Sequence, residues 1–406
     1  MKNNNSLFSI YAFGVMLQLL YSMYAYFLWW MYEGMAYSFL LDVIVAISGF
    51  VYMEVNNIPI RIRFRVIIIF LAVWLVEALN PIGMVGALLK CPLSFLVILL
   101  LDRKSKLKLL DVWTSLFAVI LFVSLIAWLF AMSGVLPSYE TIHFGNDISY
   151  VYQNHILCLV NMNLHNFDVI RYGSIFLEPG HVSMIGAYTL YANRFDFKKK
   201  TTWVILIASL ATFSLAGYVL IIIGYLMMSL QNYSFQKSIK GIILSCAMLG
   251  AAYFVTISYN NGDNLVNTLI LKRTEYDSEK GFVGNNRVYL DTEMTFDKFM
   301  NSTEVVTGYD FDTYQKYLKN GTIAGAGYKM YLMEKGILGT LIVFFIYVFI
   351  LKRSVDKRFV FWFFLLYVIS FWQRAWPTSY IWLFLFVFAT AVQKPSELYK
   401  SKIIVK

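Results

Sequence analysis

The chain has 406 residues, of which 59% are hydrophobic and only 14% are charged. Soluble domains are closer to half apolar and a quarter charged, so the composition excludes an ordinary soluble globular protein and indicates a protein that lies in lipid. The net charge of +10 would indicate a nucleic-acid partner in a soluble chain. In a membrane protein, excess lysine and arginine mark cytoplasmic loops, so we expect no nucleic-acid binding.

A helix needs about 20 apolar residues to cross the hydrocarbon core of a bilayer. The first apolar run, residues 7–30, is too long for the hydrophobic region of a signal peptide and has no small-residue cleavage site. We therefore predict that it is a retained span. Four further spans are predicted before the first polar segment, at residues 35–53, 66–78, 82–101 and 112–132. Short basic loops follow the second and the fourth span.

The chain then alternates between polar and apolar character. Two long polar segments, residues 133–180 and 258–335, are separated by apolar runs. The run 202–230 fits one long tilted helix or two short helices turned near residues 214–217, and the lysines beyond it favour the hairpin. The remaining spans are predicted at residues 181–192, 241–257, 336–351, 359–371 and 379–392.

These features predict an all-α polytopic membrane protein with about twelve transmembrane helices in one integral membrane domain, residues 1–406. Placing the short basic loops inside puts both termini in the cytoplasm and both long polar segments outside. The cysteines match neither a disulfide framework nor a metal motif. The four histidines are spaced by 12, 10 and 16 residues, which matches no compact ligand motif, so we expect no bound metal.

The first outer segment ends in a polar string directly before a predicted span. Residues 171–181 read Arg-Tyr-Gly-Ser-Ile-Phe-Leu-Glu-Pro-Gly-His. Proline favours the first position of a helix, so Glu178 is expected at the N-terminal cap. The helix start also offers N–H groups and a positive dipole end, which suit an anion such as phosphate. Arg171, Glu178 and His181 are therefore predicted to gather at the outer mouth of the membrane domain.

This string resembles the signature of the Wzy-type O-antigen and capsule repeat-unit polymerases, which carry a similar Arg-x-x-Gly-x-Phe-x-Glu-Pro-Gly string in an outer loop. Here Ser174 stands where that glycine would fall, with Gly173 just before it. Three weaker matches follow: residues 213–217 (Phe-Ser-Leu-Ala-Gly), a loop arginine at Arg287 before glycines 325 and 327, and Gly-Ile-Leu-Gly at residues 336–339.

The resemblance implies a GT-C-like membrane glycosyltransferase in the bacterial cytoplasmic (inner) membrane. Such enzymes join oligosaccharide units carried on undecaprenyl diphosphate at the extracytoplasmic, periplasmic face, in lipopolysaccharide or capsule biosynthesis. The resemblance implies no cofactor and no metal. The partners that the resemblance implies are undecaprenyl-diphosphate-linked oligosaccharides, membrane lipid and a chain-length-regulating co-polymerase.

Arginine suits a lipid diphosphate leaving group because its planar fork pairs bidentately with phosphate and stays charged. By match to the family pattern, Arg171 and Arg287 are assigned as diphosphate clamps, with Arg273 as the reserve. Either Glu178 or His181 would be the base or the group that orients the acceptor. Histidine titrates nearer neutral pH, which favours His181 as the base.

Each of these residues also has a purely structural interpretation. Arg171 and Glu178 would form an exposed ion pair or a helix cap, and Arg287 would be a solvated loop charge. Arg374, between two aromatic-rich spans, would anchor the membrane interface or meet a lipid phosphate. Asp42 and Glu77 lie inside predicted spans, where ionisable groups are costly and usually functional.

Two other functions fit the same pattern of spans. An O-antigen ligase, in the same fold class, moves finished glycan onto a lipid core, and the Glu-Pro-Gly string favours the polymerase over it. A transporter or flippase of lipid-linked oligosaccharide would also have about twelve spans. Transporters typically contain internal repeats and broken helices at the middle of the membrane, and the sequence has no repeat symmetry.

Overall fold

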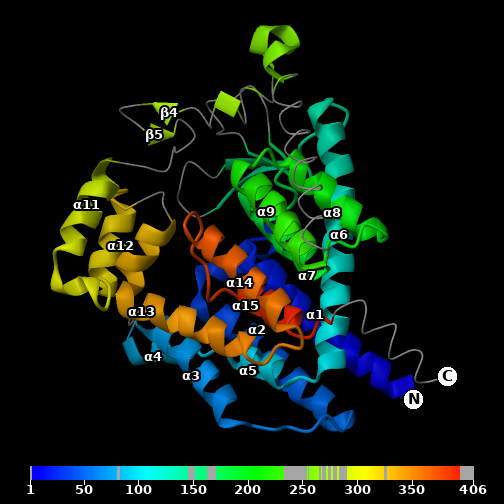
Figure 1. Ribbon diagram of the computed structural model, residues 1–406, viewed down its shortest axis with the longest axis vertical. Helices are drawn as coiled ribbons and strands as arrows, with labels where there is room; N and C mark the ends of the chain where they lie inside the picture. The colour runs from blue at the N-terminus through cyan, green and yellow to red at the C-terminus, as the bar shows by residue number, and fades with distance from the viewer. Residues whose placement is uncertain are drawn as a thin grey trace. The chain divides into compact units, whose positions relative to one another are not determined.

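The computed structural model divides into two compact units, each described here by itself (Figure 1). Unit 1 comprises residues 1–114 and 289–406, and unit 2 comprises residues 115–288. The second predicted outer loop, 258–335, is therefore shared between the two units. The structure describes residues 2–79, 83–144, 151–161, 171–232, 254, 256–264, 267, 271–272, 276–277, 281–282, 290–323 and 327–393.

Unit 1 is a helical bundle around a fully buried helix. All residues from Ile381 to Ala389 of α15 (Tyr380–Ala389) are buried, and α1, α5 and α14 pack against this helix. Its continuous apolar run fits a position with neighbours on every side. The other helices of the unit are α1 (Lys2–Ser22), α2 (Met35–Val55), α3 (Phe64–Ala78), α4 (Gly83–Leu89), α5 (Leu93–Leu100), α11 (Leu290–Met300), α12 (Phe311–Lys319), α13 (Gly327–Leu351) and α14 (Lys357–Phe371).

Unit 2 is built around α7 (Pro179–Ala192), which is buried from His181 to Ala192. Helices α8 (Lys200–Ala211) and α9 (Leu215–Asn232) pack against it. The helix α6 (Arg103–Met132) belongs to unit 1 up to Thr114 and to unit 2 from Ser115. The break between α8 and α9 answers the alternative left open by the sequence, since residues 202–230 form two helices and not one.

The described residues are mostly helical, but the prediction of about twelve spans is wrong. By length and composition, three described helices qualify as membrane spans: α2, α6 and α13. Several predicted spans are shorter apolar helices, such as the 12-residue α8 and the 10-residue α15. The predicted span 241–257 lies almost wholly outside the described residues. Apolar runs of span length therefore do not each form one long helix.

Local breaks explain part of this difference. The predicted span 82–101 forms two helices, α4 and α5, on either side of Cys91 and Pro92. Proline lacks the N–H that an interior helical residue donates, and its ring collides with the preceding turn. The predicted span 7–30 likewise ends as an α-helix at Ser22 and continues from Tyr26 as a 3-10 helix (η1, Tyr26–Glu33). Between them, Tyr24 has φ +58°.

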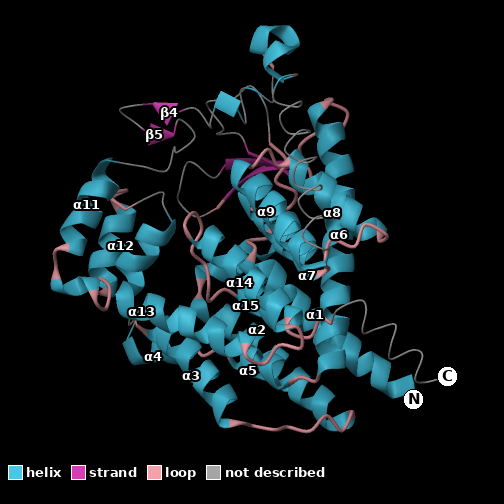
Figure 2. Ribbon diagram, in the orientation of Figure 1, coloured by secondary structure: helices cyan, strands magenta, loops and turns pink. Residues whose placement is uncertain are grey.

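A second difference is the presence of strands, which the all-α prediction lacks (Figure 2). In the first polar segment, β1 (Glu140–His143), β2 (Val151–Asn154) and β3 (Leu159–Asn161) form an antiparallel sheet in the order β1-β2-β3. Two-residue strands β4 (Tyr276–Asp277) and β5 (Gly281–Phe282) form a hairpin in the second segment. These strands have two to four residues, at or below the shortest run over which alternation is readable in a sequence.

Basic residues from separate predicted cytoplasmic loops meet at helix ends in unit 1. The Lys106 ammonium donates to the Leu99 carbonyl at 3.2 Å, and Arg353 donates to the same carbonyl at 3.3 Å. Arg103 donates from Nε to the Ala391 carbonyl at 2.9 Å. Cations at helix C-termini satisfy carbonyls that have no partner within the helix. The contacts bring these loops together at one end of the helices of unit 1, and their cytoplasmic placement stays a prediction.

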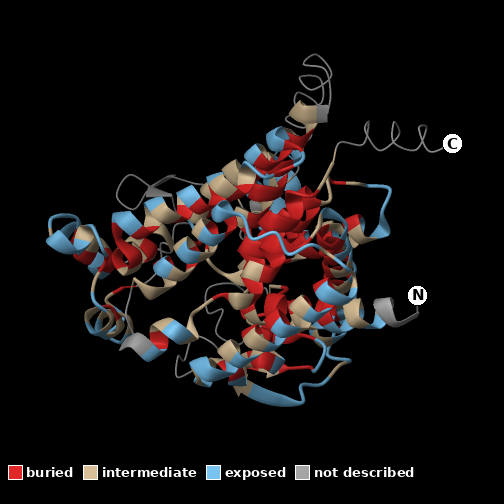
Figure 3. Cartoon of the chain, turned by 90° about the horizontal axis from the view of Figure 1, so that it is seen from below, coloured by how far each residue is buried: buried red, intermediate tan, exposed pale blue. Residues whose placement is uncertain are grey.

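Asp42, one of the two acidic residues predicted inside spans, joins four helices of unit 1. It is 1% exposed and accepts hydrogen bonds from Gln18 at 2.9 Å and from the Tyr380 hydroxyl at 2.7 Å. The Ser94 hydroxyl and backbone N–H also donate to it. A buried carboxylate is tolerated when such donors surround it. Asp42 is therefore a structural link within unit 1. Figure 3 colours the buried residues of the chain red.

The candidate span α13 is interrupted at Gly336, where φ is +67° and ψ is −179°. Only glycine adopts this conformation readily. The loop before α12 supplies the missing partners: the Tyr309 N–H donates to the Met333 carbonyl at 2.8 Å, and the Leu338 N–H donates to the Val306 carbonyl at 3.0 Å. The break therefore leaves α13 with an irregular segment that is satisfied by backbone from another part of the chain.

Candidate functional site

The string that the sequence singles out lies in unit 2, and most of it is buried. Residues 172–177 are buried, whereas Arg171 and Glu178 are half-buried at its two ends. The Arg171 Nε donates to the carbonyl of Thr212 at 2.9 Å. Thr212 is the C-terminal cap of α8, where a cation is favourable to the helix dipole. One function of Arg171 is therefore to fix the string to the end of α8.

The turn inside the string has the conformation that glycine favours, although serine occupies it. Ser174 has φ +58°, a left-handed value that costs an L-residue roughly 1–2 kcal/mol. Its hydroxyl lies 2.7 Å from that of Ser124 on α6, and its carbonyl accepts from the Leu159 N–H at 2.8 Å. Ser174 thus adopts a left-handed conformation, and tertiary hydrogen bonds hold it in place.

Tyr172 fastens the same turn to α6. Its hydroxyl donates to the Leu121 carbonyl at 2.9 Å and also hydrogen-bonds Ser124. Burial raises the pKa of the Tyr172 phenol, so the group stays protonated and remains a donor at neutral pH. The turn between residues 172 and 174 is thereby rigidly attached to one helix.

Glu178 and His181 face each other across the first turn of α7. Glu178 is the N-terminal cap residue and Pro179 occupies the first position of the helix, as the sequence predicts. The His181 Nε2 lies 3.8 Å from the Glu178 Oε2. Their exposure differs, because the side chain of Glu178 is 25% exposed and that of His181 only 2%. An incoming molecule would therefore meet the carboxylate before the imidazole.

The segment 213–217, a second part of the family resemblance, packs directly on the helix that follows the string. A Cβ added to Gly217 would lie 1.3 Å from the Ser183 hydroxyl, and one added to Gly186 would lie 2.1 Å from the Ser209 hydroxyl. Small residues permit this close approach of helices in a membrane protein. The string and the 213–217 turn therefore form one packed substructure, connected by Arg171 at one end and by α7 at the other.

Of the other predicted anion-binding residues, the structure describes only Arg374. Arg273 and Arg287 lie outside the described residues, so their pairing with Arg171 stays a prediction. Arg374 belongs to unit 1 and is buried, at 8% exposure. Its guanidinium lies 5.4 Å from the centre of the Trp376 ring. It therefore packs within unit 1, and a contact with a lipid phosphate stays a prediction.

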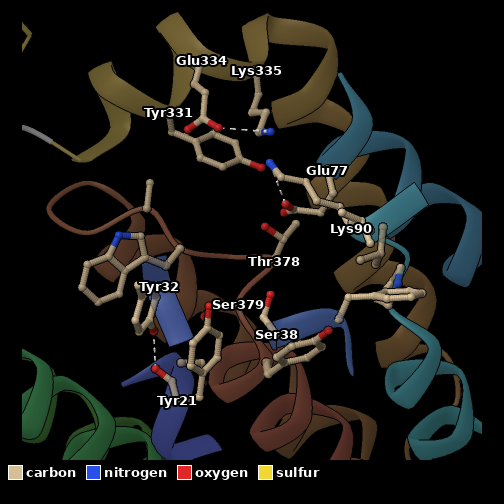
Figure 4. A pocket seen from close by; sticks show the side chains of 18 of the residues that line it. Tyr21, Tyr32, Ser38, Glu77, Lys90, Tyr331, Glu334, Lys335, Thr378 and Ser379 are labelled. Atoms are coloured by element: carbon tan, nitrogen blue, oxygen red, sulfur yellow. Dashed lines mark hydrogen bonds and ion pairs between the residues drawn. The ribbon is translucent and has the colours of Figure 1, made fainter. Parts of the chain in front are cut away.

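A second candidate site is a cavity of about 320 Å³ in unit 1. Side chains from several elements converge on it: Tyr331 from α13, Glu77 from α3, and Thr378 from the segment before α15 (Figure 4). Its volume lies at the lower end of the range for small-molecule sites. Its lining combines aromatic and charged residues. The aromatic ones are Tyr21, Tyr24, Tyr32, Phe39, Tyr331, Trp376 and Tyr380, and the charged ones are Glu77, Lys90, Glu334 and Lys335.

Two ion pairs line this cavity. The Lys90 Nζ lies 3.8 Å from the Glu77 Oε2, and the Lys335 Nζ lies 3.1 Å from the Glu334 Oε1. Lys335 is buried, with 3% of its side chain exposed, and lies immediately before the break at Gly336. A charged pair in the wall of the cavity therefore lies directly before the break in α13.

No sequence pattern predicted this cavity. Glu77 was notable only as an ionisable residue inside a predicted span. The lining residues come from positions as distant as Tyr21 and Tyr380, so no local motif unites them. The one local signal is the pair of charges Glu334 and Lys335 directly before the predicted span 336–351.

Comparison of the chain with protein-family models, with curated proteins and with solved structures found no match in any of the three.

Proposed function

We propose that the chain is a membrane glycosyltransferase that polymerises oligosaccharide repeat units carried on undecaprenyl diphosphate. The observation that supports this is the contact between the two parts of the resemblance, residues 171–181 and 213–217. Arg171 donates to Thr212 beside the second segment, and Ser183 packs on Gly217 within it. Two sequence patterns remote from each other in the chain therefore contribute to one local structure.

In this proposal Arg171 stabilises the diphosphate leaving group. Negative charge grows on the diphosphate as the sugar bond breaks, and donors fixed in advance stabilise such charge most effectively. The bond from Nε to the Thr212 carbonyl orients the guanidinium, and the adjacent turn is tied to α6. An arginine held in this way loses little conformational freedom when it binds phosphate.

The different exposure of Glu178 and His181 changes the roles that we propose for them. Glu178 is the more exposed member of the pair, so we assign it as the group that contacts the acceptor hydroxyl. His181 lies behind it at 3.8 Å and positions the carboxylate. A general base must lie within hydrogen-bond reach of the proton that it accepts, and the buried imidazole is less able to meet that condition than Glu178.

The proposed reaction takes place at the extracytoplasmic face of a bacterial cytoplasmic membrane, without a metal. Lipid-linked oligosaccharides are the substrates, and a chain-length-regulating co-polymerase is the proposed protein partner. The three apolar helices long enough to cross a bilayer are compatible with a membrane location. The grouping of Arg103, Lys106 and Arg353 at one end of unit 1 supports the proposed cytoplasmic side.

The test is the Arg171→Ala variant in a host strain that lacks the natural protein. We expect polymerisation to fall by roughly 100-fold or more, the scale on which loss of a transition-state donor acts. The measurement is the length distribution of surface glycan on a gel. Loss of a polymerase leaves single repeat units on the final acceptor, whereas loss of a ligase leaves no glycan attached.

Two further variants distinguish a catalytic role of Arg171 from its structural contact with the end of α8. Arg171→Lys keeps the charge but loses the planar fork, so we expect it to fold and still to polymerise poorly. Lys198→Ala, at an exposed position near α8, is the control and should leave the glycan pattern unchanged. Normal polymer made by Arg171→Ala, with the protein correctly inserted, would reject the proposed function.

A transporter or flippase of lipid-linked oligosaccharide is the second candidate, and one observation favours it. Helix α13 is broken at Gly336 next to the buried Lys335, and transporters place polar residues at such breaks. The site of substrate accumulation distinguishes the two functions. In a deletion strain, loss of a flippase traps the repeat units on the cytoplasmic side, whereas loss of a polymerase leaves them on the outer side.

A further inference from the structure

The cavity of unit 1 contains polar groups whose hydrogen-bonding capacity is not used by the protein. Tyr331 is 5% exposed, and neither its hydroxyl nor that of Ser379 has a hydrogen-bond partner among the described residues. A buried hydroxyl without a partner costs roughly 1–3 kcal/mol. Both residues line the cavity, and the Tyr331 ring points into it towards Glu77 and Thr378 (Figure 4). These hydroxyls are available to a ligand.

The charges around the cavity balance. Each of its two carboxylates lies beside one lysine, in the pairs Glu77 with Lys90 and Glu334 with Lys335. The Thr378 hydroxyl also hydrogen-bonds Glu77. A ligand with a net charge would compete with one of these partly buried pairs and leave the other charge of that pair unbalanced. A neutral ligand with hydroxyl groups instead finds carboxylate acceptors and ammonium donors already in place.

Aromatic rings form the wall opposite these charges. Tyr24 and Tyr21 both stack on Tyr32, with ring centres 4.8 Å and 4.3 Å apart, and the Trp376 ring lies 6.0 Å from that of Tyr24. Tyrosine and tryptophan present an apolar face together with a polar edge. Such a wall suits a molecule that has an apolar face and a polar rim, and this is the form of a sugar ring.

We propose that this cavity binds a neutral sugar residue, with Tyr331, Ser379 and Lys335 as hydrogen-bonding partners. This proposal rests on the proposed function in one respect: it requires a repeat unit that contains a neutral sugar. The preference for a neutral sugar follows from the side chains that line the cavity. Sugars that carry a carboxylate and free phosphate anions are excluded because they would disrupt the paired charges.

The experiment is ligand-observed NMR on the full-length protein in detergent. The probes are neutral hexoses, N-acetylhexosamines and deoxyhexoses, together with glucuronic acid and inorganic pyrophosphate as anionic alternatives. We expect at least one neutral sugar to bind, and the two anions to bind at least about tenfold more weakly.

Conservative variants then locate the binding. Tyr331→Phe removes one hydroxyl and leaves the ring, and we expect about 5- to 10-fold weaker binding. Ser379→Ala is the second variant and should weaken binding in the same direction. Tyr317→Phe is the matched control, because Tyr317 packs in the separate core formed around Phe299 and should leave the affinity unchanged.

Three results would overturn the proposal: no neutral sugar binds, both variants bind as the natural protein does, or pyrophosphate binds more tightly than every neutral sugar. The outcome is independent of the test of Arg171. Sugar binding retained in Arg171→Ala while polymerisation is lost supports both proposals. Polymerisation that depends on Arg171 in a protein that binds no neutral sugar rejects this inference alone.

Discussion

The two candidate sites are built in opposite ways. In unit 2 the string 171–181 is closely packed, with small residues of α7 pressed against α8 and α9 and with Arg171 tied to a backbone carbonyl. In unit 1 polar side chains surround a cavity, and the wall beside Lys335 exists because α13 is interrupted. One site depends on side-chain packing and the other on a backbone irregularity. Substitutions of glycine test these two dependencies separately.

The largest effect is expected at the break in unit 1, for Gly336→Ala. A Cβ at this position would lie 2.3 Å from the Val306 carbonyl oxygen, and the backbone conformation is one that alanine rarely adopts. Strain and backbone overlap together should cost more than about 3 kcal/mol of stability. Thermal unfolding in detergent, followed by tryptophan fluorescence, measures the loss.

Gly321→Ala is the matched control for that variant. Gly321 also has a positive φ, +68°, but nothing lies within 4 Å of an added Cβ. It should therefore show only the cost of the left-handed conformation, roughly 1 kcal/mol. Equal losses of stability in the two variants would show that the close contact between Gly336 and Val306 is unimportant. The break would then have no demonstrated role in shaping the cavity.

A smaller effect is expected for Gly217→Ala in unit 2, since here the overlap is with a side chain. The added Cβ would lie 1.3 Å from the Ser183 hydroxyl and 2.4 Å from the Ser183 Cβ. We expect a loss of about 2 kcal/mol, in the range for overpacking. Ser183→Gly removes both atoms, so the double variant should recover most of this loss.

The recovery is measured as a coupling free energy in a double-mutant cycle. The Ser183 hydroxyl has no hydrogen-bond partner in the described part of the chain, so Ser183→Gly alone should cost mainly the helix propensity of glycine, about 1 kcal/mol. Additive losses would show that α7 and α9 do not press together at this position. The packed arrangement of the unit 2 site would then be wrong.

The two sites also differ in how far the sequence predicts them. The Arg171 string is contiguous, and a proline after Glu178 marks the helix start, so its cap was predictable from local rules. The burial of His181 was not, because it arises from the packing of α8 and α9 on α7. The cavity of unit 1 was not predictable at all, since Tyr21, Glu77 and Tyr331 are remote in sequence and share no pattern.

The fold, like the two sites, could be predicted from the sequence only in part. Composition predicted a helical, apolar protein, and the lysines beyond α9 correctly favoured a break between α8 and α9. Hydropathy overestimated the number of spans because it measures apolar length and not helix continuity. Pro92 was a readable sign of a break in one run. The left-handed residue Tyr24 and the interruption at Gly336 depend on tertiary partners such as Val306, which no window along the sequence reveals.

The smallest effect is expected at Ser174, where serine occupies the glycine position of the family pattern. Ser174→Gly relieves the strain of φ +58° but removes the hydrogen bond to Ser124, which is 2.7 Å long. The two changes are each about 1 kcal/mol and opposite in sign, so stability should change little. Ser174→Ala loses the bond and keeps the strain, and should be about 1 kcal/mol less stable than Ser174→Gly. Thermal unfolding of the two variants side by side measures this difference. If the alanine variant is the more stable, the turn does not require a left-handed residue, and the match of this string to the glycine pattern has no structural basis.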